Sequence, residues 1–326
     1  MSSNLDEKLS MDHLNQLDKK GGVNTIAEEP LKFERPSLGK IQSKESNISL
    51  ANDPGWKILP FNNLPSLGIS YPDNSEIAIR SAKVFEIRQW STIDESDNLS
   101  INDQLNFILE KCMSFKIKGH PVLMDWKDLL LIDRFFIIFR IHELTFPNNE
   151  NTMSKLFTCS NCKEPKFSEI VQVKSSMLQL FNMPEEIMSF YDEKNKAFVV
   201  ESSKFEPFFI FMPTLGAQSK VRDYVKFKGS SLKDDWFIKV APYMIDDYRS
   251  VNNEWLDKFR MSTLDWNESK FMFVTKAIDL LESAKSNTLS KKCPKCDNLI
   301  SQNIFTSPNF TIKNLFIVST KLRDLI

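Results

Sequence analysis

Short runs in which polar and apolar residues alternate predict strands in several parts of the chain. Residues 76–80 (Glu-Ile-Ala-Ile-Arg) and 84–88 (Val-Phe-Glu-Ile-Arg) alternate in this way, which is typical of half-buried strands. Residues 170–173 predict another strand. Residues 198–211 are dense in β-branched and aromatic side chains, which favours the two strands of a hairpin, and a turn follows at residues 212–216.

Apolar residues recur at helical spacing in other segments. Residues 101–113 place them on one face, so we expect an amphipathic helix whose core-facing stripe includes Cys112. A helix predicted over residues 125–144 is apolar on most sides and should be central, with Pro147 after its end. Its charged residues are interpreted as surface or salt-bridged positions: Asp133, Arg134, Arg140, His142 and Glu143. Further helices are predicted at 184–191, 252–261 and 267–284, and a helix start at 92–95.

The first 60 residues have a different composition from the rest. They are poor in aromatic residues, rich in Ser, Asn, Asp, Glu and Lys, and interrupted by Gly and Pro. We predict an extended or disordered N-terminal arm over residues 1–60 that orders against a partner, with order beginning near Trp56; a disordered tail is the alternative.

Four of the five cysteines form two Cys-x-x-Cys pairs. A two-residue spacer allows one tight turn to present both sulfurs to a tetrahedral ion. Neighbouring lysines would offset the negative charge of the thiolates. A reducing compartment with metal-bound thiolates fits this pattern better than a secreted disulfide scaffold. The predicted ligands of one structural Zn²⁺ are Cys159, Cys162, Cys293 and Cys296.

Other readings of the cysteine pairs are weaker. Four thiolates can also hold an iron–sulfur cluster. Thioredoxin-like redox activity would require a pair after a strand at the start of a helix, which neither pair shows. A catalytic zinc would need an open coordination position and a nearby base, and none of the three histidines is near a pair in the sequence.

The distance between the pairs shapes the predicted fold. Residues suited to a strand follow each pair, as in a zinc ribbon, but a long segment separates the two halves. We therefore predict an α+β fold: a strand-and-helix domain at 61–150 and a split four-cysteine zinc-ribbon base at 151–326. A hairpin-and-helix subdomain at 177–285 is inserted into that base.

Composition narrows the possible functions. The net charge is −1, with 42 basic and 43 acidic side chains, whereas nucleic-acid binders usually carry a basic excess. The eight glycines form no phosphate-binding loop, and no apolar run is long enough to span a membrane. Twenty-six Phe against five Tyr favours dry cores or partner-facing grooves. We expect no enzyme, no catalytic residues, no small-molecule substrate, no membrane partner and no specific nucleic acid.

A series of motifs occurs in a fixed order between residues 61 and 310. It begins with Leu-Pro-Ser-Leu-Gly-Ile-Ser-Tyr-Pro at 64–72 and continues with Leu-Leu-Leu-Ile-Asp-Arg at 129–134. The first cysteine pair, Pro-Thr-Leu-Gly at 213–216 and Cys-Pro-Lys-Cys at 293–296 follow. In this order the series resembles the T4-like bacteriophage baseplate protein family, the baseplate hub and hub-assembly subunits of contractile-tailed phages.

The resemblance implies a non-enzymatic structural component of the baseplate hub region that docks other hub or wedge proteins. It would be located in the virion tail baseplate, and in the host cytoplasm during assembly. One alternative is a transient hub-assembly chaperone that is absent from the mature virion. Another is a zinc-ribbon regulator that binds nucleic acid, which the Lys-rich second cysteine pair favours slightly.

Overall fold

The computed structural model describes residues 55–90, 98–120, 123–147, 152–162, 166–172, 174–177, 183–229, 234–283 and 288–303. Most of the predicted arm (1–54) and the helix start at 92–95 lie outside these residues. In the part of the chain that is described, no helix combines the length and the apolar character needed to cross a lipid bilayer.

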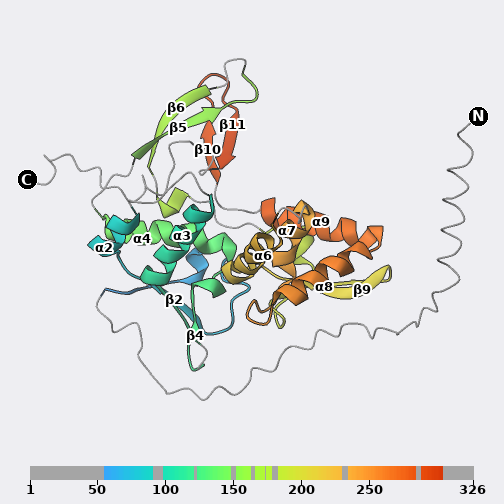
Figure 1. Cartoon of the computed structure of the whole chain (residues 1–326). Helices are drawn as coiled ribbons and strands as arrows, with labels where there is room; N and C mark the ends of the chain where they lie inside the picture. The colour runs from blue at the N-terminus through green and yellow to red at the C-terminus, as the bar shows by residue number, and fades with distance from the viewer. Residues whose placement is uncertain are drawn as a thin grey trace, which may run out of the picture. The chain divides into compact units, whose positions relative to one another are not determined.

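A four-stranded antiparallel sheet organises the first half of the chain (Figure 1). Its second strand confirms the prediction at 76–80, and Ile77 of this strand lies opposite Phe115 in the neighbouring one. The first strand begins directly after Trp56, within the last residues of the stretch predicted as an arm. The strand order follows the sequence: β1 (Lys57–Leu59), β2 (Ser75–Ile79), β3 (Met113–Ile117) and β4 (Leu123–Met124).

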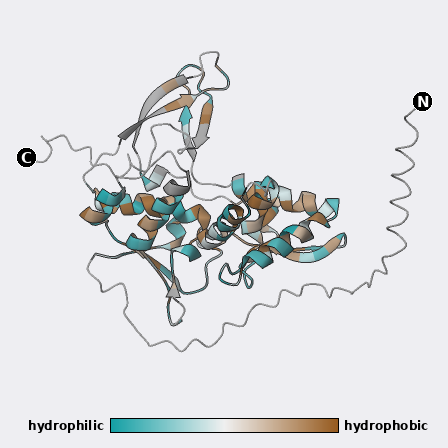
Figure 2. Cartoon of the chain, viewed as in Figure 1, coloured by the Kyte–Doolittle hydropathy of each residue, from teal (hydrophilic) through white to brown (hydrophobic). Residues whose placement is uncertain are grey.

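Two helices pack together beside this sheet. Helix α3 (Asn98–Cys112) confirms the helix predicted at 101–113, and Cys112 is fully buried in the core as expected. Helix α4 (Arg134–Thr145) contacts both α3 and β2. Figure 2 shows hydrophobic and hydrophilic residues together on these helices. Helix α4 is buried on most sides, as expected, because seven of its twelve residues are buried.

The strand predicted at 84–88 is wrong, because this segment is helix α2 (Val84–Trp90). Glu86 explains the difference. Its carboxylate accepts a hydrogen bond of 2.7 Å from the Lys83 N–H just before the helix and two more from Arg80, at 3.0 and 2.7 Å. Capping of this kind favours a helix start. The alternation is also misleading about burial, since Val84 and Phe85 are exposed and Glu86 is buried.

The single helix predicted over 125–144 is interrupted. Short 3-10 turns, η3 (Trp126–Asp128) and η4 (Leu131–Asp133), occupy its first third, and α4 begins only afterwards. Between these turns the backbone pairs with a distant segment: the Leu131 N–H donates to the Pro213 carbonyl, and the Leu215 N–H donates to the Leu129 carbonyl. This long-range pairing competes with the local helical pattern, and no local signal reveals it.

The interpretation of the charged residues in this region as surface positions is wrong for three of them. Asp133, Arg134 and His142 are buried. The Arg134 guanidinium donates to the side chain and the backbone carbonyl of Asn102, both at 2.8 Å. Arg140 and Glu143 do form an ion pair, at 2.7 Å, in agreement with their interpretation as surface or salt-bridged positions.

The second half of the chain contains a three-stranded sheet and four longer helices. The hairpin predicted at 198–211 is confirmed as β8 (Ala197–Ser202) and β9 (Phe205–Ile210), with β7 (Tyr191–Asp192) at its edge. The helix predicted at 184–191 is shorter, α5 (Glu185–Met188). The helices predicted at 252–261 and 267–284 are confirmed as α8 and α9, whereas α6 and α7 were not predicted. Their bounds are α6 (Leu215–Lys228), α7 (Asp235–Val240), α8 (Asn253–Leu264) and α9 (Glu268–Ser283).

Two separate hairpins complete the described chain. One is β5 (Thr152–Thr158) with β6 (Lys166–Gln172), which includes the strand predicted at 170–173 as far as Gln172. The other is β10 (Thr288–Lys292) with β11 (Leu299–Asn303). The described chain therefore mixes helices with small antiparallel sheets, which confirms the mixed helix and sheet content that the sequence predicts.

Candidate metal centre

Both Cys-x-x-Cys pairs lie in the loops of the two hairpins. The β5–β6 register ends at Thr158 opposite Lys166, so its loop contains Cys159 and Cys162. The β10–β11 register ends at Lys292 opposite Leu299, so its loop contains Cys293 and Cys296. Strands β5 and β11 lie side by side, although they are far apart in the sequence (Figure 1). We call these four strands and their loops the two-hairpin unit.

The four sulfur atoms form a compact cluster. The Sγ atoms of Cys159 and Cys296 are 3.7 Å apart, and those of Cys162 and Cys293 are 3.6 Å apart. All four lie within 4.8 Å of one another. A tetrahedral zinc site with Zn–S bonds of about 2.3 Å has sulfur–sulfur edges of about 3.8 Å. The observed separations match these edges and far exceed a disulfide bond of about 2.05 Å.

The second loop has the backbone geometry of a tight cysteine turn. The Asp297 N–H donates to the Cys293 carbonyl at 3.0 Å, and the Cys293 N–H donates to the Asn298 carbonyl at 2.9 Å. Asp297 takes a left-handed conformation with φ 55°, which Asp tolerates better than most residues. The two bonds fold the loop so that both of its sulfurs face the other hairpin.

Hydrogen bonds shift the pKa values of the two cysteines in the first loop in opposite directions. Burial raises the pKa of Cys159, but hydrogen bonds from the Asn161 N–H and from the Cys296 thiol outweigh burial and lower it to about 7. Hydrogen bonding with Cys296, together with burial, raises the pKa of Cys162 to about 12. Of the two cysteines in the first loop, Cys159 is therefore the more readily deprotonated. A bound metal ion is what allows four thiolates to share one site.

Apolar packing supports the cluster, and its buried residues belong to the main hydrophobic core. Phe157 is fully buried and its ring stacks on Phe167, with the ring centroids 5.5 Å apart. Ile300, Cys159 and Cys293 are buried as well. Cys296 is exposed, which leaves the site open to solvent on one side.

The structure brings together all four cysteines that the sequence predicts as ligands. Within the described ranges, this is the one group of three or more His, Cys, Asp or Glu residues placed to hold a metal ion. Of the neighbouring lysines, Lys163 lies outside the described residues, Lys291 is half-buried, and Lys292 and Lys295 are exposed.

A polar contact also attaches the two-hairpin unit to the helices. The short turn η5 (Ser175–Met177) follows β6, and both the N–H and the hydroxyl of Ser175 donate to the Glu143 carboxylate on α4. Because Glu143 also pairs with Arg140, its side chain is held from two sides. The interpretation of Glu143 as a surface or salt-bridged position is correct, and the contact with Ser175 is an addition to it.

The motif at residues 64–72 has a structural role, because two of its residues bind a buried carboxylate. Ser66 and Tyr71 from this motif both donate hydrogen bonds to the buried carboxylate of Asp133, which belongs to motif 129–134. The two motifs are about 60 residues apart in the sequence, and one buried acid joins them. Asp133 is interpreted from the sequence as a surface or salt-bridged position, because a charged residue within a predicted helix usually faces solvent. Its burial was therefore not predicted.

Comparison of the chain with protein-family models, curated protein sequences and solved structures gives no match.

Proposed function

We propose that Cys159, Cys162, Cys293 and Cys296 bind one structural Zn²⁺ as a split zinc ribbon, in a non-enzymatic protein of a contractile phage tail baseplate. The observation that carries the metal site is the separation of the sulfur atoms across the hairpins, 3.6 and 3.7 Å. Four cysteine ligands fill a tetrahedral shell and leave no open position for substrate or water, which fits a structural role.

The metal would act as a cross-link between the two hairpins, which we call the staple. Residues 163–292, 130 in all, separate the two cysteine pairs, and this segment contains β7–β9 and α6–α9. Each hairpin has only two strands, and isolated two-stranded hairpins are marginally stable. Zinc binding contributes about 10–16 kcal/mol in small zinc-finger peptides. One ion would thus hold both hairpins and close the base of the long intervening segment.

The assembly role rests on the motif series and on the exposed surface. Large apolar side chains are exposed on the helices, with Phe227 69%, Leu264 70% and Val84 67% accessible. They lie on three different helices, α2, α6 and α8, and are candidate contact points for a partner. We propose hub or wedge proteins as the partners, with the virion baseplate as the final location and the host cytoplasm as the place of assembly.

Metal analysis of the purified full-length chain tests the staple. We expect one zinc per chain by native mass spectrometry and elemental analysis, lost on denaturation. Cys159→Ser should lose the zinc, whereas the matched control Cys112→Ser should keep it, because Cys112 lies in the main core. A stoichiometric iron content with visible absorbance would show that the site holds an iron–sulfur cluster instead of zinc. No metal in the native protein would overturn the site.

Peptide mass spectrometry of purified phage particles tests the assembly role separately. Peptides of this chain in intact tails would support a structural component. Their absence from tails, with the chain present in assembly intermediates, would instead favour the hub-assembly chaperone. Salt-dependent binding to DNA by the zinc-loaded chain would favour the nucleic-acid-binding regulator.

A further inference from the structure

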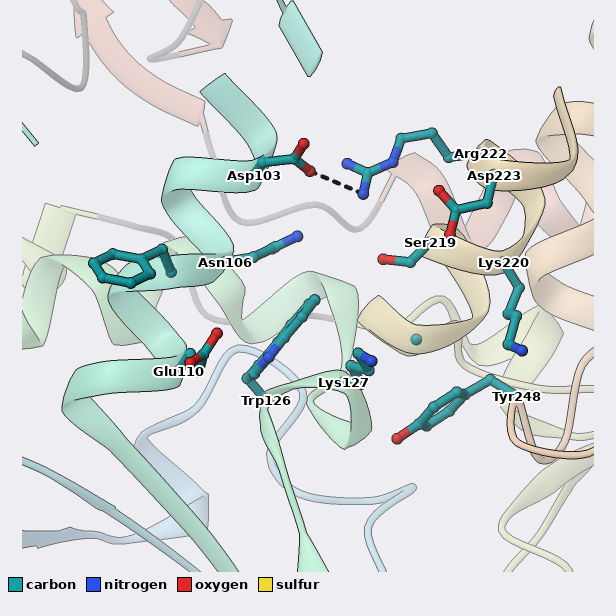
Figure 3. A pocket seen from close by; sticks show the side chains of 12 residues that line it. Asp103, Asn106, Glu110, Trp126, Lys127, Ser219, Lys220, Arg222, Asp223 and Tyr248 are labelled. Carbon is teal, nitrogen blue, oxygen red and sulfur yellow. Dashed lines mark ion pairs between the residues drawn. The ribbon is translucent and has the colours of Figure 1, made fainter. Parts of the chain in front are cut away.

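The thiols of the candidate metal centre are the side chains of this fold that are placed for a redox reaction. A cavity of about 450 Å³ lies elsewhere, between α3, η3 and α6, but the residues that line it include no cysteine or histidine (Figure 3). Its Arg222 and Asp103 form an ion pair of 3.0 Å, drawn as a dashed line in Figure 3. Cys112, the fifth cysteine, is fully buried in the main core. Solvent-borne oxidants would therefore react at the four clustered cysteines.

Each loop of the two-hairpin unit carries one buried cysteine and one that is more accessible. Cys159 and Cys293, the first residues of the two pairs, are 1% and 2% exposed. Cys162 is half-buried and Cys296 is exposed. An oxidant that diffuses in from solvent therefore meets Cys296 first.

The sulfur contacts of 3.7 and 3.6 Å both cross from one hairpin to the other. The first joins the exposed Cys296 to the buried Cys159, and the second joins the half-buried Cys162 to the buried Cys293. In each contact an accessible sulfur thus faces a buried one. A disulfide bond is about 2.05 Å long, so each pair would have to close by only about 1.6 Å, a shift that two side chains can share.

We propose that a peroxide converts the four cysteines into two disulfides between the hairpins, Cys159–Cys296 and Cys162–Cys293. This inference rests on the proposed zinc site and adds a modification to it. The proposed function also supplies the change of environment, because a tail protein is assembled in a reducing cytoplasm and then leaves it for an oxidising exterior.

The reaction would begin at Cys296. A thiol that coordinates a metal ion is already deprotonated, so it is nucleophilic without a separate base. The Cys296 sulfur attacks one oxygen of the peroxide: an S–O bond forms, the O–O bond breaks and hydroxide leaves, which gives a sulfenic acid. The Cys159 thiolate then attacks the Cys296 sulfur. An S–S bond forms, the S–O bond breaks and a second hydroxide leaves.

The second pair reacts in the same way with a second molecule of peroxide. The two peroxide molecules accept four electrons from the four thiolates and leave as four hydroxide ions. The centre loses all of its thiolate ligands, so the metal ion is released. Because both disulfides connect the hairpins, covalent bonds would take over the role of the staple. A disulfide within either loop would also release the ion, but it would leave the hairpins unconnected.

Peroxide treatment of the zinc-loaded full-length chain tests the pairing. A chromogenic chelator measures zinc release, and mass spectrometry after trypsin digestion identifies the disulfides. Trypsin cleaves after Lys295, which separates Cys293 from Cys296, whereas Cys159 and Cys162 stay in one peptide, 156–163. We expect loss of one zinc and four hydrogen atoms per chain, with peptide 156–163 linked to both 293–295 and 296–313. Fragmentation of the linked peptides should assign Cys159 to Cys296 and Cys162 to Cys293.

Amide hydrogen exchange shows whether the disulfides replace the metal. In the oxidised chain, exchange in β5 and β11 should stay slow when chelator is added. Chelator together with a thiol reductant should make it fast, because neither cross-link then remains. Cys112→Ser is the matched control and should give the same two disulfides, since Cys112 takes no part in the reaction.

Several results would overturn the inference. These are a disulfide confined to one loop, the opposite pairing of Cys159 with Cys293, sulfinic acid at Cys296 without any disulfide, and fast exchange in β5 and β11 of the oxidised chain. Failure here is distinguishable from failure of the proposed function, because zinc content is measured before peroxide is added. A chain that holds zinc but oxidises within its loops would lose only the pairing. A chain without zinc that forms both cross-hairpin disulfides would keep the pairing and lose the metal site.

Discussion

Ser66 donates twice to Asp133: its backbone N–H reaches one carboxylate oxygen at 2.8 Å, and its hydroxyl reaches the other at 2.6 Å. The Tyr71 hydroxyl donates to the same carboxylate at 2.8 Å and accepts the Leu130 N–H at 3.0 Å. Asp133 is fully buried. A buried carboxylate is tolerated only when its oxygens are satisfied, so these bonds fix the loop at 64–72 against the start of α4.

Ser66→Ala should lower the free energy of unfolding by about 2 kcal/mol, because a buried acceptor loses a donor. The Gly68 N–H, which donates to the Ser66 hydroxyl at 3.1 Å, loses its partner as well. Urea denaturation followed by circular dichroism measures the change. Ser75→Ala is the matched control: its hydroxyl donates to the Pro72 carbonyl at an exposed position, and we expect a change within about 0.5 kcal/mol. Equal losses in the two variants would contradict the role of Ser66.

The stability of the chain should depend on pH through Asp133. Burial raises the pKa of Asp133 to about 6 from an ordinary value of 3.8, although hydrogen bonds from Ser66 and Tyr71 lower it. Between these values the folded state holds a proton that the unfolded state releases. The contribution to stability is therefore complete below pH 3.8 and is lost as the pH rises through 6, by up to about 3 kcal/mol.

Asp133→Asn isolates this effect, since the variant cannot titrate at this position. The difference in unfolding free energy between the two proteins should change between pH 4 and 6 and become constant above about pH 7. Two other effects also depend on pH: acid release of zinc, and the titration of Glu86, whose pKa is lowered by its hydrogen bonds in spite of its burial. Both affect the two proteins equally, so they cancel in the difference. Urea titrations at several pH values measure it, and a difference that does not vary with pH would refute the assignment.

The clustering of the four cysteines was predictable from the sequence because their spacing alone carries the signal. A Cys-x-x-Cys pair predicts a tight turn wherever it occurs, and the structure brings both turns to one cluster. The hairpin at 198–211 and helix α9 were predictable for a similar reason, since their apolar periodicity is long and uninterrupted. In each of these cases, the local pattern and the tertiary environment favour the same structure.

The sequence predictions failed where distant contacts override local pattern. Glu86 is buried by its pairing with Arg80, so the alternation around it predicts the wrong element and the wrong exposed residues. Leu130 leaves the helical pattern because it forms a bridge with Thr214. Helix α6 was missed although Thr214 caps it by accepting the Ala217 N–H at 3.1 Å; a Thr before a segment with apolar residues at helical spacing is the signal that would have found it.

Removal of metal should loosen the two-hairpin unit selectively. A chelator added to the zinc-loaded chain should accelerate amide hydrogen exchange in β5, β6, β10 and β11, because neither hairpin is stable alone. Exchange in β2 and β3 should remain slow, since these strands belong to a four-stranded sheet in the main core. Cys159→Ser is the control: its hairpins should exchange quickly from the outset, and chelator should add nothing. Hairpin protection that survives complete metal removal would show that no staple is needed.

Gly216→Ala should destabilise the chain although alanine is the better helix former. Gly216 lies in the first turn of α6, where a Cβ atom would be 2.4 Å from Cδ1 and 2.5 Å from Cγ of the Tyr248 ring. Overpacking of this kind costs about 1–3 kcal/mol and outweighs the gain of about 1 kcal/mol in helix propensity. Gln218→Ala on the same helix is the control and should have little effect.

In a Tyr248→Ala background the clash is absent, so Gly216→Ala should become neutral or stabilising. A double-mutant cycle from urea denaturation measures the coupling between the two positions. Additive effects of the two substitutions would show that the ring and the glycine do not constrain each other.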